Sequence, residues 1–290
     1  MEREDRIEVF TDTVGCVSRG YYTNKKGEKI DIPTQSEGLS LDNASYYSSD
    51  IKKKINFDKL KRYPTEIKVV NQDCLYAAKE LIDLGYSPAV VNNASFKRPG
   101  GGVVGGSAAQ EENLCRRTNL FESIFRFHKD MAKEYGLPFE EQAYPLPVNH
   151  GAIYSPSIAV FKASEDKNYE YLDEPFMLDI ITIAALKNPK LNQKGELDDW
   201  SKGVTKSKIR AMLNLAIYWE NDSIILGAFG CGAFGNPPNE IAKLFKEVLE
   251  EPEYCDKFEK IVFAIIDDKN SYKEHNPKGN YLPFKELFNS

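Results

Sequence analysis

Long apolar runs, paired cysteines and clustered histidines are all missing from this sequence of 290 residues. No apolar run reaches the ~18 residues that a membrane-spanning helix needs, and the charged start MEREDRIEVF lacks the apolar stretch of a secretory signal. The five cysteines are scattered without a Cys-x-x-Cys pair, and the three histidines lie far apart. We therefore expect a cytoplasmic protein with reduced thiols, no membrane segment and no metal site.

An excess of basic residues is also missing. The chain has 38 Lys and Arg residues against 44 Asp and Glu residues, for a formal net charge of −6. Direct binding to duplex DNA is not expected, because such binders need a basic surface that releases counterions. A small anionic ligand held by backbone amides stays possible.

Short apolar runs alternate with amphipathic segments from residue 67 onward. This alternation predicts an α/β fold whose sheet is covered on both faces. Residues 1–62 are polar and predict an N-terminal extension, with a short helix, that packs on a catalytic domain at 63–290. Residues 129–152 predict a long loop. The predicted strands are 67–70, 89–92, 154–161, 177–185, 223–229 and 261–266, and the predicted helices are 74–85, a segment from about 108, 205–221 and 237–250, the last with Asn236 as its N-cap.

Two glycine-rich loops each follow a predicted strand. Gly100–Gly106 has five glycines in seven positions, and Gly227–Gly235 runs toward a helix N-terminus. Backbone amides in such loops can bind anions, and the two loops together could hold the two phosphates of a pyrophosphate. Both also match G-x-G-x-x-G, so a Rossmann dinucleotide fold is a rival interpretation. The second match lacks the acidic residue that this fold has ~20 residues further on.

Adjacent carboxylates follow the first loop in the segment Gln110-Glu111-Glu112. Charge alone favours a solvated pair stabilised by a helix N-terminus. The preceding loop changes this interpretation, because any ligand bound by the loop would lie close to the two glutamates. A partly desolvated carboxyl group there could act as a general acid.

The segment RPGGGVVGGSAAQEENLCRRTNLF resembles the GGG-x(6–8)-QEE signature of poly(ADP-ribose) glycohydrolases, a family of catalytic macrodomains. The segments VVNNASFKRPGGG, AIYSPSIAVF, IILGAFGCGAFGNPP and VFAIIDD stand in the order of its bacterial-type branch. The resemblance implies a macrodomain-like three-layer α/β/α fold with a mixed sheet. It also implies a glycosidase that releases ADP-ribose from poly(ADP-ribose), without a cofactor.

The resemblance also implies roles for individual residues. Glu112 is similar to the catalytic acid, and Glu111 would hold a ribose hydroxyl beside it. Asp73 would accept from the adenine amino group; its position also fits a helix N-cap, and it could serve as both. Which of Asn92 and Asn93 faces the terminal ribose stays open. The remaining expected substrate-binding residues are Gly100, Gly101, Gly102 and Gln110 in the first loop region, and Gly230, Cys231, Gly232, Ala233, Phe234 and Gly235 in the second.

Two other functions share most of these features. A macrodomain that binds ADP-ribose without cleaving it needs the glycine loops but no acid at Glu112. A hydrolase of ADP-ribose attached to protein or nucleic acid needs the same ADP-ribose site as one that acts on the polymer. The sequence does not distinguish these substrates.

Overall fold

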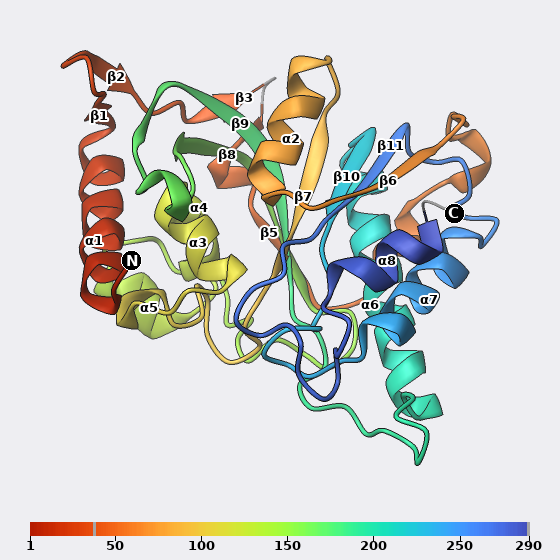
Figure 1. The fold of residues 1–290 in the computed structure, drawn as a ribbon. Coiled ribbons are helices and arrows are strands. Elements are labelled where there is room, and N and C mark those ends of the chain that lie inside the picture. Colours follow the sequence, from red (N-terminus) through yellow and green to blue (C-terminus); the bar gives the residue numbers. More distant parts are fainter. Residues whose placement is uncertain (37–38, 289–290) are drawn as a thin grey trace. The chain divides into compact units, whose positions relative to one another are not determined.

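The computed structural model describes residues 1–36 and 39–288 (Figure 1). The chain divides into two compact units. Unit 1 consists of Met1–Tyr46, Ala94–Leu146 and Ile153–Thr182, and unit 2 consists of Tyr47–Asn93, Pro147–Ala152 and Ile183–Ser290. The boundary that the sequence suggests at residue 62 stays a prediction.

Unit 1 contains the N-terminal helix, the first glycine loop and most of two long strands. The helix α1 (Arg3–Arg19) has 17 residues, so it is longer than the short helix expected there. Its buried face mixes Phe10 with Thr13 and Cys16, which weakens the apolar periodicity. The strand β8 (Ala152–Lys162) is buried throughout and neighbours β9 (Tyr171–Ile183). The smaller strands and 3-10 turns are β1 (Tyr21–Thr23), β2 (Lys29–Asp31), β3 (Gln35–Ser36), β4 (Leu39–Ser40), η1 (Leu41–Asn43), β5 (Ser45–Tyr47), η4 (Val103–Gly105) and η5 (Glu165–Lys167).

Three short helices follow the first glycine loop. They are α3 (Gln110–Arg117), α4 (Leu120–Phe125) and α5 (Lys129–Glu134). The sequence suggested a loop over 129–152, but α5 occupies its first turns. A ring nitrogen of His128 caps this helix by accepting from the Met131 amide at 3.4 Å. A capping histidine gives no strong signal in a sequence, because Ser, Thr, Asp and Asn are the usual caps.

Unit 2 is built on four parallel strands in the order β7-β10-β11-β6. The register pairs Ile224 with Ala89, Ile225 with Val262, and Phe263 with Val69. Parallel pairing brings the carboxyl ends of the four strands to one edge of the sheet. The strands are β6 (Glu66–Val70), β7 (Pro88–Asn93), β10 (Ser223–Leu226) and β11 (Lys260–Ala264).

Helices of unit 2 pack on these strands (Figure 1). The helix α2 contacts β7, β10 and β11, and α8 contacts β6 and α7. Phe263 of β11 lies against Phe245 of α7 and Phe284 of α8, with ring centroids 5.2 Å apart in both pairs. The helices are α2 (Cys74–Asp83), α6 (Asp199–Tyr218), α7 (Pro238–Leu249) and α8 (Tyr281–Phe288), and the 3-10 turns are η2 (Ile51–Lys54) and η3 (Phe57–Lys59).

The predicted N-cap of α7 is wrong by one residue. The cap is Pro237, and α7 begins at Pro238. The side-chain amide of Asn236 instead donates to the carbonyl oxygens of Leu186 at 2.7 Å and Gly230 at 3.0 Å. Long-range acceptors therefore compete with the helix for this side chain. The strand predicted over 223–229 likewise ends at Leu226, where the chain turns into the second glycine loop.

Candidate active site

The first glycine loop of unit 1 lies directly against the two adjacent glutamates. Gly101 has a positive φ of 56°. A Cβ atom at this position would lie 2.5 Å from Oε1 of Glu112 and 2.9 Å from Oε2 of Glu111. A residue with a side chain would displace both carboxylates, so this approach requires glycine.

Backbone amides hold both carboxylates. Glu111 accepts from the Gly100 amide at 3.1 Å and from the Ser95 amide at 2.7 Å. Glu112 accepts from the Gly102 amide at 2.8 Å through Oε1. Its other oxygen, Oε2, is buried and has no hydrogen-bond partner among residues 1–36 and 39–288. The loop is thus an anion-binding nest whose anions are the protein's own carboxylates.

The position of the pair at the start of α3 adds a favourable field. Both glutamates lie in the first helical turn, where the partial positive charge of the N-terminus favours carboxylates. Glu111 is 2% exposed and Glu112 is 7% exposed, so the interpretation as a solvated surface pair is wrong. The two carboxylates are thus kept largely out of water and are fixed by backbone amides.

A thiol and a phenol are buried in the same part of unit 1. Burial raises the pKa of Cys115 well above its usual range, and the charges of Glu111 and Glu112 raise it further. Burial also raises the pKa of Tyr144, again with help from Glu111. The hydroxyl group of Tyr144 has no hydrogen-bond partner within the described part of the chain. Burial therefore disfavours the thiolate of Cys115 and the phenolate of Tyr144.

The other expected ligand-binding residues follow the strands of unit 2. Asp73 comes after β6 and caps α2, since its carboxylate accepts from the Leu75 amide at 3.1 Å and the Tyr76 amide at 3.2 Å. The N-cap interpretation is therefore confirmed. Asn92 is fully buried at the end of β7, whereas Asn93 is half-buried. The side-chain nitrogen of Asn93 lies 2.8 Å from where a Cβ atom on Gly227 would be.

The second glycine loop of unit 2 is held by its carbonyl groups. Asn236 donates to Gly230, as described above, and His275 and Asn276 both lie within hydrogen-bond distance of the Cys231 carbonyl oxygen, at 2.8 Å and 3.3 Å. The Cys231 side chain is fully buried. Among the described residues, the amides of Gly232 and Ala233 donate to no protein group. This loop has the unpaired N–H groups that an anionic ligand can use.

The structure therefore forms two groups of expected site residues. Unit 1 brings together Gly100, Gly101, Gly102, Glu111 and Glu112, with half-buried Gln110 at the start of α3. Unit 2 gathers Asp73, Asn92, Asn93 and the loop Gly230–Gly235 at the carboxyl edge of its strands. Sequence reasoning missed the supporting residues Ser95, Tyr144, His275 and Asn276. The partners named above for Ser95, His275 and Asn276 lie 16 or more residues away, and the Tyr144 hydroxyl has no hydrogen-bond partner among the described residues, so no spacing marks these four.

The described residues contain no group of three or more His, Cys, Asp or Glu side chains that could hold a metal ion. No described helix is both long and apolar enough to cross a membrane.

The fold is macrodomain-like, and its first glycine loop lies against a buried pair of carboxylates. The family described as "Microbial-type PARG, catalytic domain" matches residues 11–163, which is more than half of the chain. The chain belongs to this family, and not to the Rossmann enzymes that the G-x-G-x-x-G spacing also allowed. No curated protein sequence matches the chain.

Solved structures of poly(ADP-ribose) glycohydrolases share the fold. The enzyme from Thermomonospora curvata is 24% identical, with 98% of this chain and 100% of that chain covered and a TM-score of 0.76. The same enzyme bound to the inhibitor ADP-HPD is 23% identical, with 98% and 99% covered and a TM-score of 0.74. The enzyme from Deinococcus radiodurans in complex with ADP-ribose is 24% identical, with 88% and 98% covered and a TM-score of 0.66. The predicted macrodomain-like α/β/α fold with a mixed sheet is confirmed.

Proposed function

We propose that this protein is a poly(ADP-ribose) glycohydrolase that cleaves the ribose–ribose O-glycosidic bond and releases ADP-ribose. One observation carries the proposal. Glu112 is anchored through Oε1 by the Gly102 amide, while its buried Oε2 has no partner among the described residues. An acid fixed through one oxygen, with the other available, suits proton delivery to a bound ligand.

The proposed reaction follows glycosidase chemistry. Glu112 transfers a proton to the departing ribose oxygen, the C–O bond breaks, and positive charge develops on the anomeric carbon. The ionised Glu112 then takes a proton from a water molecule, whose oxygen bonds to that carbon. One carboxylate can serve both steps if the diphosphate of the ligand stabilises the cation. These steps use no metal ion.

Glu111 has a different role in this proposal. Both of its oxygens already accept from backbone amides, whereas Glu112 has one such bond. Consecutive helical residues also point ~100° apart, so the two carboxylates cannot serve one atom equally. We assign Glu111 to holding the loop and the ribose.

The expected binding residues of unit 2 would recognise the rest of the ligand. Asp73 would accept from adenine while it caps α2. Asn92 or Asn93 would approach the ribose, and Phe234 would pack near it. The loop Gly230–Gly235 would bind the diphosphate through the amides of Gly232 and Ala233, which have no protein acceptor within the described residues. The relatives named above support this assignment, because one is an ADP-ribose complex.

The decisive experiment compares wild type with Glu112→Gln, in both ADP-ribose release from poly(ADP-ribose) and ADP-ribose binding. Glutamine keeps the size and the acceptor for the Gly102 amide but cannot deliver the proton. We expect a ~10²–10⁴-fold loss of release with binding nearly unchanged. Glu134→Gln, at an exposed position on α5, is the matched control and should keep both activities.

Each other result has a defined meaning. Release by Glu112→Gln within about threefold of wild type contradicts the proposed role of this carboxylate. Wild-type protein that binds ADP-ribose but releases none from polymer is a binding module. If the wild-type protein instead releases ADP-ribose only from modified protein or nucleic acid, it cleaves the bond that links ADP-ribose to that macromolecule and uses the same ADP-ribose site.

A further inference from the structure

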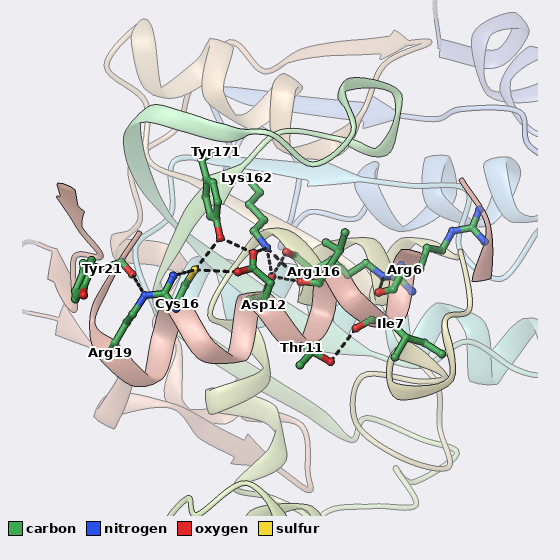
Figure 2. Close-up of polar contacts among 12 residues, drawn as sticks. Arg6, Ile7, Thr11, Asp12, Cys16, Arg19, Tyr21, Arg116, Lys162 and Tyr171 are labelled. Atoms are coloured by element: carbon green, nitrogen blue, oxygen red, sulfur yellow. Dashed lines mark hydrogen bonds and ion pairs between the residues drawn. The ribbon is translucent and has the colours of Figure 1, made fainter. Parts of the chain in front are cut away.

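Two buried cations fasten the N-terminal helix of unit 1 (Figure 2). Arg116 of α3 is fully buried and donates through Nε to the Arg6 carbonyl oxygen at 3.1 Å. The Thr13 hydroxyl donates to the Arg116 carbonyl oxygen at 2.5 Å. Lys162 of β8 donates to Oδ2 of Asp12 and to the Thr13 hydroxyl, both at 2.8 Å. These charge-assisted bonds fix α1 against α3 and β8.

The first turn of α1 also reaches the end of the glycine loop. Nε of Arg3 donates to the Gly105 carbonyl oxygen at 2.5 Å. Gly106 has a φ of 73°, and a Cβ atom there would collide with the Arg3 carbonyl oxygen. The guanidinium of Arg116 holds the same stretch through a hydrogen bond to the Ser107 carbonyl oxygen. Residues 105–107 are therefore held from both α1 and α3.

The end of the loop is in turn bonded to the residue that anchors the acid. The amides of Gly105 and Ser107 both donate to the Gly102 carbonyl oxygen, at 3.0 Å and 3.1 Å. The amide of Gly102 donates to Glu112. A continuous set of hydrogen bonds thus leads from Arg3 and Arg116, through the loop, to the carboxylate.

We propose that α1 is a positioning element of the active site, and that Arg3 of α1 and Arg116 of α3 are the positioning residues. Neither residue acts on the substrate in this proposal. They fix residues 105–107, which set the orientation of the Gly102 peptide and of the Glu112 carboxylate. This inference rests on the proposed function, because it assigns Glu112 the acid role. The alternative is that α1 only packs on unit 1.

The test inserts one methyl group where α1 meets the loop. Gly106→Ala pushes Arg3 away, whereas Gly136→Ala is the matched control. Gly136 also has a positive φ, 65°, but a Cβ atom there meets nothing within 4 Å. Both variants place alanine at a positive φ, but only Gly106→Ala also drives a Cβ atom into α1. Arg3→Ala removes the exposed side chain without opening the core.

We expect Gly106→Ala to lose at least about tenfold in kcat, because a misplacement near 1 Å can cost about 10²-fold. Its affinity for ADP-ribose should stay within twofold of wild type, and Gly136→Ala should keep the wild-type kcat. Arg3→Ala should lower kcat in the same direction by a smaller factor. Equal kcat in Gly106→Ala and Gly136→Ala, per folded molecule, would overturn the proposal.

A second readout does not depend on hydrolysis. Labelling with ¹⁵N-glycine gives the signals of 19 glycine amides, including that of Gly102. Hydrogen exchange at Gly102 should accelerate in Gly106→Ala and stay slow in Gly136→Ala. If wild-type protein cleaves no polymer, the proposed function fails while this measurement still tests the positioning. Unchanged hydrogen exchange of the Gly102 amide in Gly106→Ala would contradict the positioning role of α1 but not the proposed function.

Discussion

The two glycine loops differ in which of their backbone groups are occupied. In unit 1, the amides of Gly100 and Gly102 donate to glutamates of the same unit. In unit 2, side chains bind the carbonyl groups of the second loop, and the amides of Gly232 and Ala233 have no acceptor among the described residues. Similar glycine content thus produces two devices. The first loop holds a pair of carboxylates, and the second has N–H groups that can bind an anion.

The two units also differ in whether their buried lysine has a charged partner. Lys162 and Lys208 are each 2% exposed. Lys162 has the carboxylate of Asp12 as a partner at 2.8 Å, which opposes the lowering of its pKa by burial. The one hydrogen-bond partner of Lys208 among the described residues is the Pro147 carbonyl oxygen, at 3.2 Å. Burial lowers the pKa of Lys208 to about 8.

The largest effect on the difference between the loops is expected from a methyl group added to the first loop. Gly101→Ala would drive a Cβ atom into both carboxylates. We expect ADP-ribose release to fall by about 10²-fold or more, because the acid loses its orientation. Gly136→Ala carries the cost of a positive φ, about 1–2 kcal/mol, without this collision. Release rates and urea midpoints should be measured for both variants. Similar release rates in the two variants would show that the hydrogen bonds from the loop amides to the glutamates do not affect hydrolysis.

A substitution in the second loop should instead lower the affinity for ADP-ribose. Gly232 does not have a positive φ, and a Cβ atom there would meet Asn270 at an ordinary 3.6 Å. Gly232→Val should therefore fold but shield the two amides. We expect ADP-ribose affinity to fall about 10- to 100-fold, which corresponds to ~1.5–3 kcal/mol of charge-assisted hydrogen bonding. Gly203→Val, at an exposed site in α6 with nothing near its Cβ atom, is the control. Normal affinity in folded Gly232→Val rules out the diphosphate role of this loop.

The lysines should differ in how stability depends on pH. Lys208 has a folded pKa of about 8 against an ordinary 10.5, so the unfolded chain binds more protons between these values. The free energy of unfolding should rise across this window, by about 1–3 kcal/mol at ~1.4 kcal/mol per pKa unit. Lys208→Met should lack this rise. Lys162→Met should instead destabilise the protein, because Asp12 and Thr13 lose their shared donor. Urea unfolding of the three proteins at pH 7, 8.5 and 10 provides the comparison. If the free energy of unfolding changes with pH in the same way in wild type and Lys208→Met, the explanation by burial of the Lys208 charge is contradicted.

Local patterns predicted the elements that local interactions determine. The spacing of Cys74, Ala77, Ala78 and Leu81 gives α2 its buried face, and Asp73 caps this helix as its position suggested. The apolar runs of β7, β10 and β11 are buried strands, as expected for a covered parallel sheet. The paired glutamates and the glycines before them were also visible, because they are close in sequence.

Features that depend on distant partners could not be predicted in this way. Asn236 has the residue type and position of an N-cap, but its amide binds carbonyl groups, one of them 50 residues away. Arg116 and Lys162 look like ordinary charged residues until α1 lies beside them. Tyr144 stands in a proline-rich stretch that predicted only a loop. In each case, tertiary contacts override what the neighbouring sequence suggests.

Because backbone amides hold the two glutamates, the site depends on the path of the main chain more than on the side chains around it. Every residue except proline supplies an amide, so changes in neighbouring side chains leave the donors to Glu111 and Glu112 in place. The sequence is constrained where the glycines lie close to the carboxylates, as at Gly101, and at the two glutamates themselves. A carboxylate pair held in this way can keep its orientation while many side chains around it change.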